Sequence, residues 1–332
     1  MKMSLGAAMF YSILEVFPAL IILGVVQGLT EFLPVSSSGH LLIAQHVLGF
    51  GGSQFGNDLL FFNVMLHFGT LIAVLAVYRK EVIELIKAFF RMISKIFKKE
   101  FDFKKMDDNE NMVVMLIVGL LPLFMLFLPV FGTGMNIKGI AEELANEKNI
   151  LIVGVSLVFT SFLLRKGIKA ETSAKISAVS ANGEGAVEGR TRLEIMDAVS
   201  IGVMQFVAAI FPGISRSGST LSVALMRGIN KKTALDYSFI LGIPAIVAAV
   251  VLELKEAVEQ GAISSEGVLP PIVGVVVSAV VGFYAIKLFK WLLKTDKMNV
   301  FVIYTLVVGV ISILIGIIEM ITGASLFHGL FS

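Results

Sequence analysis

The chain has 332 residues, of which 56% are hydrophobic and 16% are charged, and it carries a net charge of +2. About a quarter of the residues of a typical soluble domain are charged, so the composition argues against a soluble protein. The absence of cysteine excludes disulfides, zinc–thiolate sites and a thiol nucleophile. The N-terminal apolar run ends without a clear small-residue cleavage site, so we expect it to belong to the mature protein and not to a signal peptide.

Long apolar runs predict that the chain crosses a membrane several times. Residues 61–78, 112–131 and 300–318 are long enough to cross a hydrocarbon layer of about 30 Å as helices. The period-two alternation of a membrane β-strand is absent. The predicted fold class is therefore an all-α polytopic membrane protein, with one integral membrane domain over residues 1–332.

Positive charge gathers in four segments, which are expected to face the cytoplasm. These segments are 79–105, 165–192, 227–232 and 287–297. Threading the chain between them predicts six transmembrane helices, near residues 59–79, 111–131, 149–165, 233–253, 269–287 and 298–320. The polar segment 169–190 is expected to be a flexible loop.

Two apolar regions, 5–50 and 194–228, are not used by these crossings. The second has arginines at both of its ends, so it must enter the membrane and return. Each region has a polar centre and is too short for two full spans. Both are predicted to be re-entrant helical hairpins, which are tolerated only where protein or a wet cavity encloses them.

The two hairpins resemble each other in sequence. In "GVVQGLTEFLPVSSSGH" and "GVMQFVAAIFPGISRSGST", a Gly, a Gln and a Pro recur at identical spacing, 178 residues apart: Gly24, Gln27 and Pro34 match Gly202, Gln205 and Pro212. The charge pattern makes the hairpins open to opposite sides. We therefore predict an inverted-topology repeat with halves 1–165 and 166–332, and a site where the two polar tips face each other.

Three ionisable residues of the tips, Glu31, His40 and Arg216, are costly within a membrane and so indicate a function. A guanidinium beside hydroxyls and a glycine-rich turn suits a phosphate group. Ser37 or His40 could attack phosphorus, with Glu31 or His40 as the base. The oxygen-bearing side chains of Gln27 and Glu31 could hold Mg²⁺ or Ca²⁺. The remaining residues expected to bind substrate are Ser36, Ser38, Gly213, Ser215, Ser217 and Thr220.

The same residues also fit purely structural roles. Glu31 could form a salt bridge with Arg216, and His40 could join two helices by a hydrogen bond. Serines in membrane helices often donate to the carbonyl one turn back. An inverted repeat is also typical of transporters, so a polyprenyl-phosphate flippase is the alternative to an enzyme.

The two motifs closely resemble those of the bacitracin-resistance family, the undecaprenyl-diphosphate phosphatases. The first motif falls on Gln27, Glu31, Pro34, Ser36, Ser37, Gly39 and His40, and the second on Pro212, Gly213, Ser215, Arg216, Ser217 and Thr220. The resemblance in layout covers nearly the whole chain. Gln27 departs from the pattern, because many members have glutamate there, so metal binding is expected to rest more on Glu31.

The resemblance implies a divalent-metal-dependent membrane phosphatase that recycles the carrier lipid for cell-wall synthesis and confers bacitracin resistance. Its catalytic residues would be Glu31, Ser37, His40 and Arg216, with Gln27 and Thr220 assisting. It implies a polyprenyl diphosphate and the bilayer as partners, with no nucleic acid, and a site open to the outer side of the cytoplasmic membrane. It also suggests a homodimer, although no residue of the sequence indicates a dimer interface.

Overall fold

The computed structural model describes residues 5–48, 56–145, 150–182, 189–259, 269–323 and 326, and the regular structure of these residues is entirely helical. In chain order the α-helices are α1 (Leu5–Phe32), α2 (Ser37–Leu48), α3 (Gly56–Val77), α4 (Arg79–Phe97), α5 (Asp108–Leu120), α6 (Ile137–Leu144), α7 (Ile150–Asn182), α8 (Ile195–Ile210), α9 (Arg216–Met226), α10 (Lys231–Glu259), α11 (Leu269–Lys294) and α12 (Asn299–Thr322). Two 3-10 helices, Phe103–Lys105 and Leu121–Phe127, flank α5.

Five of the six predicted crossings are confirmed by the lengths and apolar character of the helices. Five helical segments are long and apolar enough to span a membrane: 108–127, 150–177, 231–259, 271–294 and 299–322. The sixth crossing corresponds to α3, after which the chain bends by 84° into α4. The fold is therefore that of an all-α polytopic membrane protein.

The segment 169–190 was expected to be a flexible loop, and for most of its length this is wrong. Residues 169–182 continue α7 as one helix, and residues 183–188 lie outside the described residues. The reason is composition, because Ala, Lys and Glu of "KAETSAKISA" favour helix. The boundary between the predicted halves falls inside α7 and stays a prediction.

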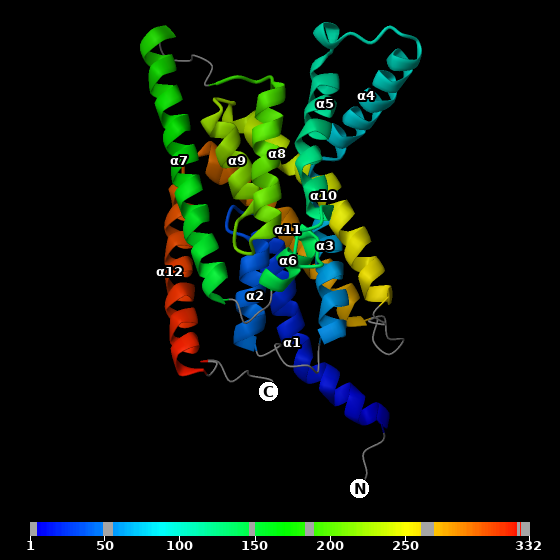
Figure 1. Cartoon of the computed structure of the whole chain (residues 1–332), viewed down its shortest axis with the longest axis vertical. Coiled ribbons are helices and arrows are strands. Elements are labelled where there is room, and N and C mark those ends of the chain that lie inside the picture. The colour runs from blue at the N-terminus through cyan, green and yellow to red at the C-terminus, as the bar shows by residue number, and fades with distance from the viewer. Residues whose placement is uncertain are drawn as a thin grey trace.

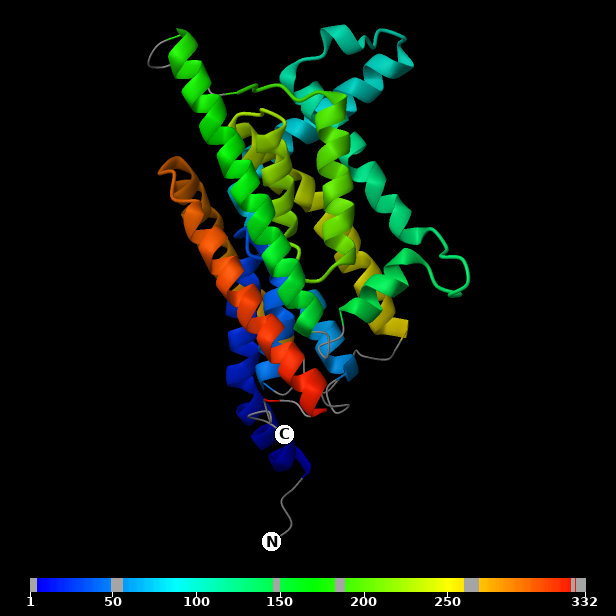
Figure 2. The ribbon, with the colours of Figure 1, turned by 60° about the vertical axis from the view of Figure 1, so that its left-hand side comes forward.

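The basic segments lie together at one end of the molecule. Lys231 is 2.6 Å from Asp296 and 3.6 Å from Glu171, so it joins three of the four segments. Arg192 donates to the carbonyl of Met106, just beyond the fourth segment, at 3.0 Å. Figures 1 and 2 show α4 and the start of α8 at this end, opposite the N-terminus.

The helices pack in the pairwise pattern expected of an inverted repeat. Helix α1 packs on α11 and α8 packs on α5, while α3 packs on α10 and α7 on α12. The matched glycines lie at the first two contacts: a Cβ at Gly24 would lie 3.1 Å from Val277 of α11, and one at Gly202 would overlap Gly119 of α5. In Figures 1 and 2 the α1–α2 hairpin rises from the lower end and the α8–α9 hairpin descends from the upper end.

A chain of buried aromatic rings fills the core beside the hairpin tips. Phe32 at the end of α1 meets Phe239 of α10 with ring centroids 5.7 Å apart, and Phe239 in turn meets Phe289 of α11 at 5.7 Å. Edge-on and tilted contacts of this kind add stability beyond area burial. They fix the end of α1, and therefore Glu31, against the second half of the chain.

Candidate functional site

Both hairpins reverse through a short turn that ends in a serine cap. Ser36 precedes α2, and its hydroxyl accepts from the Gly39 N–H at 3.2 Å. Ser215 precedes α9 and accepts from the Gly218 N–H at 3.1 Å. The caps make Ser36 and Ser215 equivalent, so Arg216 occupies in α9 the place that Ser37 has in α2. The second turn is one residue longer, as the sequences indicated.

The two turns lie directly against each other. A Cβ at Gly39 would lie 2.9 Å from the Cα of Gly213, and one at Gly218 would lie 3.0 Å from the Cβ of Pro34. The Ser217 hydroxyl donates to the Leu33 carbonyl at 3.1 Å. A Cβ at Gly39 would overlap the backbone of Gly213, so glycine is needed there, whereas a Cβ at Gly218 would make a tight contact that a small shift of Pro34 can relieve.

Glu31 connects the hairpins at their tips. Its Oε1 accepts from Arg216 Nη2 at 2.5 Å, and its Oε2 accepts from the Ser37 hydroxyl at 2.7 Å and from Gln27 Nε2 at 3.1 Å. Glu31 is 7% exposed, so this ion pair is largely shielded from solvent. The structure thus brings the carboxylate of Glu31 and the hydroxyl of Ser37 together with the guanidinium of Arg216, which lies 185 residues from Glu31 in the sequence.

Gln27 has a free oxygen beside this carboxylate. Gln27 is fully buried, and its Oε1 is a buried oxygen with no hydrogen-bond partner among the described residues. An unsatisfied buried acceptor is unfavourable and indicates a missing partner. Gln27 Oε1 and Glu31 are therefore available as oxygen ligands for a cation.

The Arg216 guanidinium fits against α10 only because residue 242 has no side chain. A methyl group at Gly242 of α10 would overlap Arg216 Nη1. The guanidinium therefore rests on the backbone of α10, which aims it at Glu31. Nothing in the sequence marks Gly242 as part of the site, because a glycine within an apolar helix gives no sign of what packs on it.

His40 lies one helical turn beyond Ser36 and has partners of its own. Its Nδ1 is 2.8 Å from the Ser36 carbonyl, and its Nε2 is 2.8 Å from the hydroxyl of Tyr304 in α12. Within the described part of the chain, no hydrogen bond joins His40 to Glu31 or Arg216. Tyr304 was also missed, since it lies 264 residues away inside a continuous apolar run.

Most of the other predicted hydroxyls make hydrogen bonds within the protein. Thr220 donates to the carbonyl of Arg216 at 2.8 Å and contacts the Ser238 hydroxyl. Ser38 lies 3.3 Å from the Ser36 hydroxyl and 3.5 Å from the Gly213 N–H. Ser215 caps α9 and Ser217 donates across the tips, as described above. Their roles in substrate binding stay predictions.

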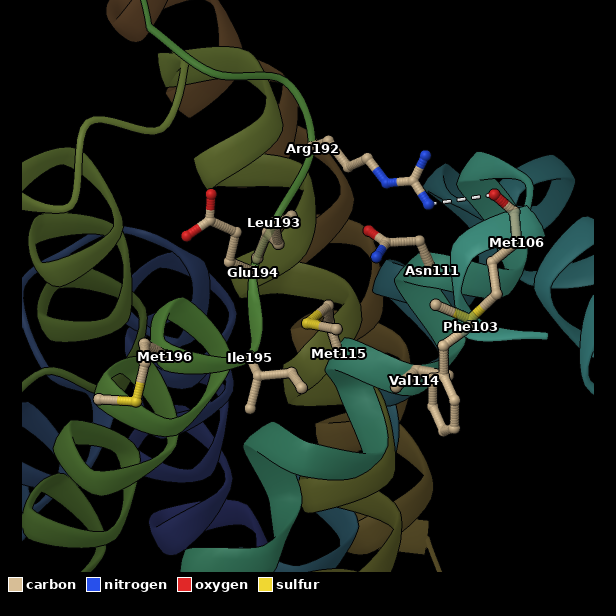
Figure 3. Close-up of a pocket in the computed structure, with 10 residues that line it drawn as sticks. All are labelled: Phe103, Met106, Asn111, Val114, Met115, Arg192, Leu193, Glu194, Ile195 and Met196. Atoms are coloured by element: carbon tan, nitrogen blue, oxygen red, sulfur yellow. Dashed lines mark hydrogen bonds between the residues drawn. The ribbon is translucent and has the colours of Figure 1, made fainter.

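A separate cavity of about 490 Å³ lies between α5 and residues 192–196 (Figure 3). It is lined by Arg192, Glu194 and mainly apolar side chains, and by none of the predicted site residues. It lies at the end of the molecule that holds the basic segments. The reactive groups therefore place the candidate site at the hairpin tips and not in this cavity.

Comparison with known proteins shows the family of this chain. The family described as bacitracin resistance protein BacA matches residues 20–311. The chain belongs to this family. Among other members, a protein of Alkaliphilus metalliredigens named undecaprenyl-diphosphatase is 35% identical over 90% of this chain and 98% of its own length.

Two further relatives carry similar names. The undecaprenyl-diphosphatase of Korarchaeum cryptofilum is 33% identical over 90% of this chain and 98% of that protein. Undecaprenyl-diphosphatase 4 of Bacillus thuringiensis is 35% identical over 88% of this chain and 94% of that protein. Residues 20–311 of the family match include every residue of the two tips.

Proposed function

We propose that the chain is an undecaprenyl-diphosphate phosphatase, which releases inorganic phosphate from undecaprenyl diphosphate and leaves undecaprenyl phosphate. This reaction returns the carrier lipid to cell-wall synthesis and opposes bacitracin. The observation that carries the proposal is the Glu31–Arg216 contact, which joins the two hairpins at one small polar site. The names of the BacA-family relatives support the same reaction.

The terminal phosphate would bind where two helices begin. Ser37 is the first residue of α2 and Arg216 is the first residue of α9. The start of a helix presents free N–H groups and a partial positive charge, which favour a phosphate. The Arg216 guanidinium adds a planar fork of donors. When the substrate binds, its phosphate would replace Glu31 as the partner of Arg216. The Glu31 carboxylate would then be free to accept a proton.

The hydrogen bond from Ser37 to Glu31 favours Ser37 over His40 as the nucleophile. Ser37 Oγ would attack the terminal phosphorus while its proton passes to Glu31. The bond from phosphorus to the bridging oxygen breaks as the new bond forms, and undecaprenyl phosphate leaves. Water would then hydrolyse the phosphoserine, releasing phosphate and restoring the Ser37 hydroxyl.

Substitution of Ser37 tests this assignment. We expect Ser37→Ala to lower kcat by about 10²-fold to 10⁴-fold, the range for loss of an activated group. Phosphate release from undecaprenyl diphosphate by purified protein is the measurement, with rapid quenching in neutral detergent, in which both phosphoserine and phosphohistidine survive, to trap ³²P on the chain. Label on Ser37 of the wild type would support the proposal. Label on His40, or unchanged kcat in Ser37→Ala, would contradict it.

A divalent cation fits the site only together with the substrate. Within the described residues, no three Asp, Glu or His side chains lie close enough together to hold a metal ion, and Gln27 Oε1 and Glu31 would be the protein ligands of the cation. Mg²⁺ is often held by one or two carboxylates and by substrate phosphates, and it neutralises charge on the breaking phosphoanhydride. Gln27 and Glu31 would orient it on the diphosphate.

Chelation and one substitution test the cation. We expect EDTA to stop phosphate release and Mg²⁺ or Ca²⁺ to restore it. Gln27→Glu adds a charged ligand, so it should lower the Mg²⁺ concentration for half-maximal rate by about tenfold, the equivalent of about 1.4 kcal/mol. An enzyme that is fully active after chelation would disprove the requirement, and an unchanged Mg²⁺ dependence in Gln27→Glu would remove Gln27 from the ligand set.

We further propose that the protein lies in the cytoplasmic membrane with its basic end inside the cell, because positive loops stay in the cytoplasm. The α1–α2 hairpin then enters from the outer side, and the site opens to that side. No observation on the described residues favours the flippase alternative.

A further inference from the structure

The His40 ring is held on two sides by groups from distant parts of the chain. The Ser36 carbonyl and the Tyr304 hydroxyl each lie 2.8 Å from a ring nitrogen. The rings of His40 and Tyr304 are nearly parallel, at 12°, with centroids 5.5 Å apart. His40 is thus a point at which α12 contacts α2 of the first hairpin.

The chemistry of these two partners fixes which nitrogen carries the proton. A carbonyl oxygen can only accept, so Nδ1 of His40 must be the N–H that donates to Ser36. In the neutral ring Nε2 is then the acceptor, and the Tyr304 hydroxyl donates to it. The lone pair with which His40 would act as a base or nucleophile is therefore occupied by Tyr304.

Both partners are held in place by their own helices. Ser36 has a φ of +74°, and this left-handed backbone together with its cap sets the direction of its carbonyl. Near Tyr304, the Ser161 hydroxyl of α7 donates to the Val302 carbonyl of α12 at 2.7 Å. A Cβ at Gly309 would lie 2.9 Å from the Gly154 carbonyl, so α12 lies close against α7.

We propose that Tyr304 is a positioning residue for His40, which sets the orientation of the imidazole and keeps Nε2 as a hydrogen-bond acceptor. The expected effect of Tyr304 on catalysis rests on the proposed function. The hydrogen bond between Tyr304 and His40 does not depend on that function. Tyr304 belongs to α12, near the C-terminal end of the sequence, and is part of neither motif.

Tyr304→Phe tests the hydroxyl separately from the ring, because phenylalanine lacks the hydroxyl but keeps the stacking and the bulk of the side chain. With ¹⁵N-labelled histidine, the Nε2 resonance of His40 should move downfield in Tyr304→Phe by several ppm, while Nδ1 stays. His40→Gln assigns the signals. The matched control is Tyr284→Phe, which removes a hydroxyl from a tyrosine of α11 that is 64% exposed. An unchanged Nε2 resonance in Tyr304→Phe would overturn the proposal.

A kinetic cycle tests the link to His40. Tyr304→Phe should lower kcat about tenfold with little change in KM, the size expected for one lost hydrogen bond. In a His40→Ala background it should have no further effect, since groups that act as a unit are not additive. Equal losses in both backgrounds would overturn the proposal. If the wild type releases no phosphate, the proposed function fails, and the ¹⁵N shift still decides the role of Tyr304.

Discussion

Arg216→Ala is expected to abolish phosphate release, lowering kcat/KM by about 10³-fold to 10⁵-fold, the value of an arginine that stabilises phosphoryl transfer. Its guanidinium is the charge that the second hairpin brings to Glu31. Arg216→Lys should recover only part of the activity, because an ammonium lacks the planar fork. Phosphate release by purified protein is the measurement, and turnover near the wild-type value in Arg216→Ala would contradict the assignment.

Two controls separate lost chemistry from lost folding. Breaking a buried ion pair costs about 3–5 kcal/mol because it strands the remaining charge, so Arg216→Ala should also lower the unfolding temperature. Arg216→Ala combined with Glu31→Gln should regain stability without activity. Arg165→Ala, at an exposed arginine of α7, should leave both unchanged. Activity that returns along with stability in the double variant would count against a catalytic role.

Gly242→Val is also expected to lower activity strongly, although the side chain of Gly242 takes no part in the chemistry. A side chain on Gly242 would occupy the space of the Arg216 guanidinium. The guanidinium must move, and a misplacement of about 1 Å can cost about 10²-fold in rate. We expect kcat/KM to fall by about 10²-fold or more, measured by the same phosphate-release assay.

Ala248→Val is the matched control for Gly242→Val. It places the same side chain on an exposed position of the same helix, α10. It should leave kcat/KM unchanged, since it faces away from the packed interior. Wild-type kinetics in Gly242→Val would show that α10 does not position Arg216.

The parts of the fold that follow from local composition could be predicted from the sequence. Apolar runs marked the spans, and basic segments marked the end at which Lys231, Glu171 and Asp296 meet. The repeat placed the two tips opposite each other, and the contact between Glu31 and Arg216 followed from that placement. These inferences needed only hydropathy, charge and spacing.

The features that the sequence did not reveal depend on packing between distant helices. Gly242 matters because of what lies on it, and Tyr304 is one aromatic residue among many in an apolar span. The hydroxyls of Ser217 and Thr220 have the residue types of a phosphate site, yet both donate to backbone carbonyls. Residue type alone does not distinguish a ligand-binding hydroxyl from one that joins two helices.

The central claim is that the tips of the two hairpins form one site, and a disulfide between them tests it most directly. The chain has no cysteine, so Pro34→Cys and Gly218→Cys can be combined without interference. A Cβ at Gly218 would lie 3.0 Å from the Cβ of Pro34, close to the span of a disulfide of about 3.5–4.5 Å. We expect oxidation to cross-link the double variant within one chain and to stop its phosphate release, and reduction to restore it. A double variant that does not cross-link, or that keeps its activity when cross-linked, would contradict the account.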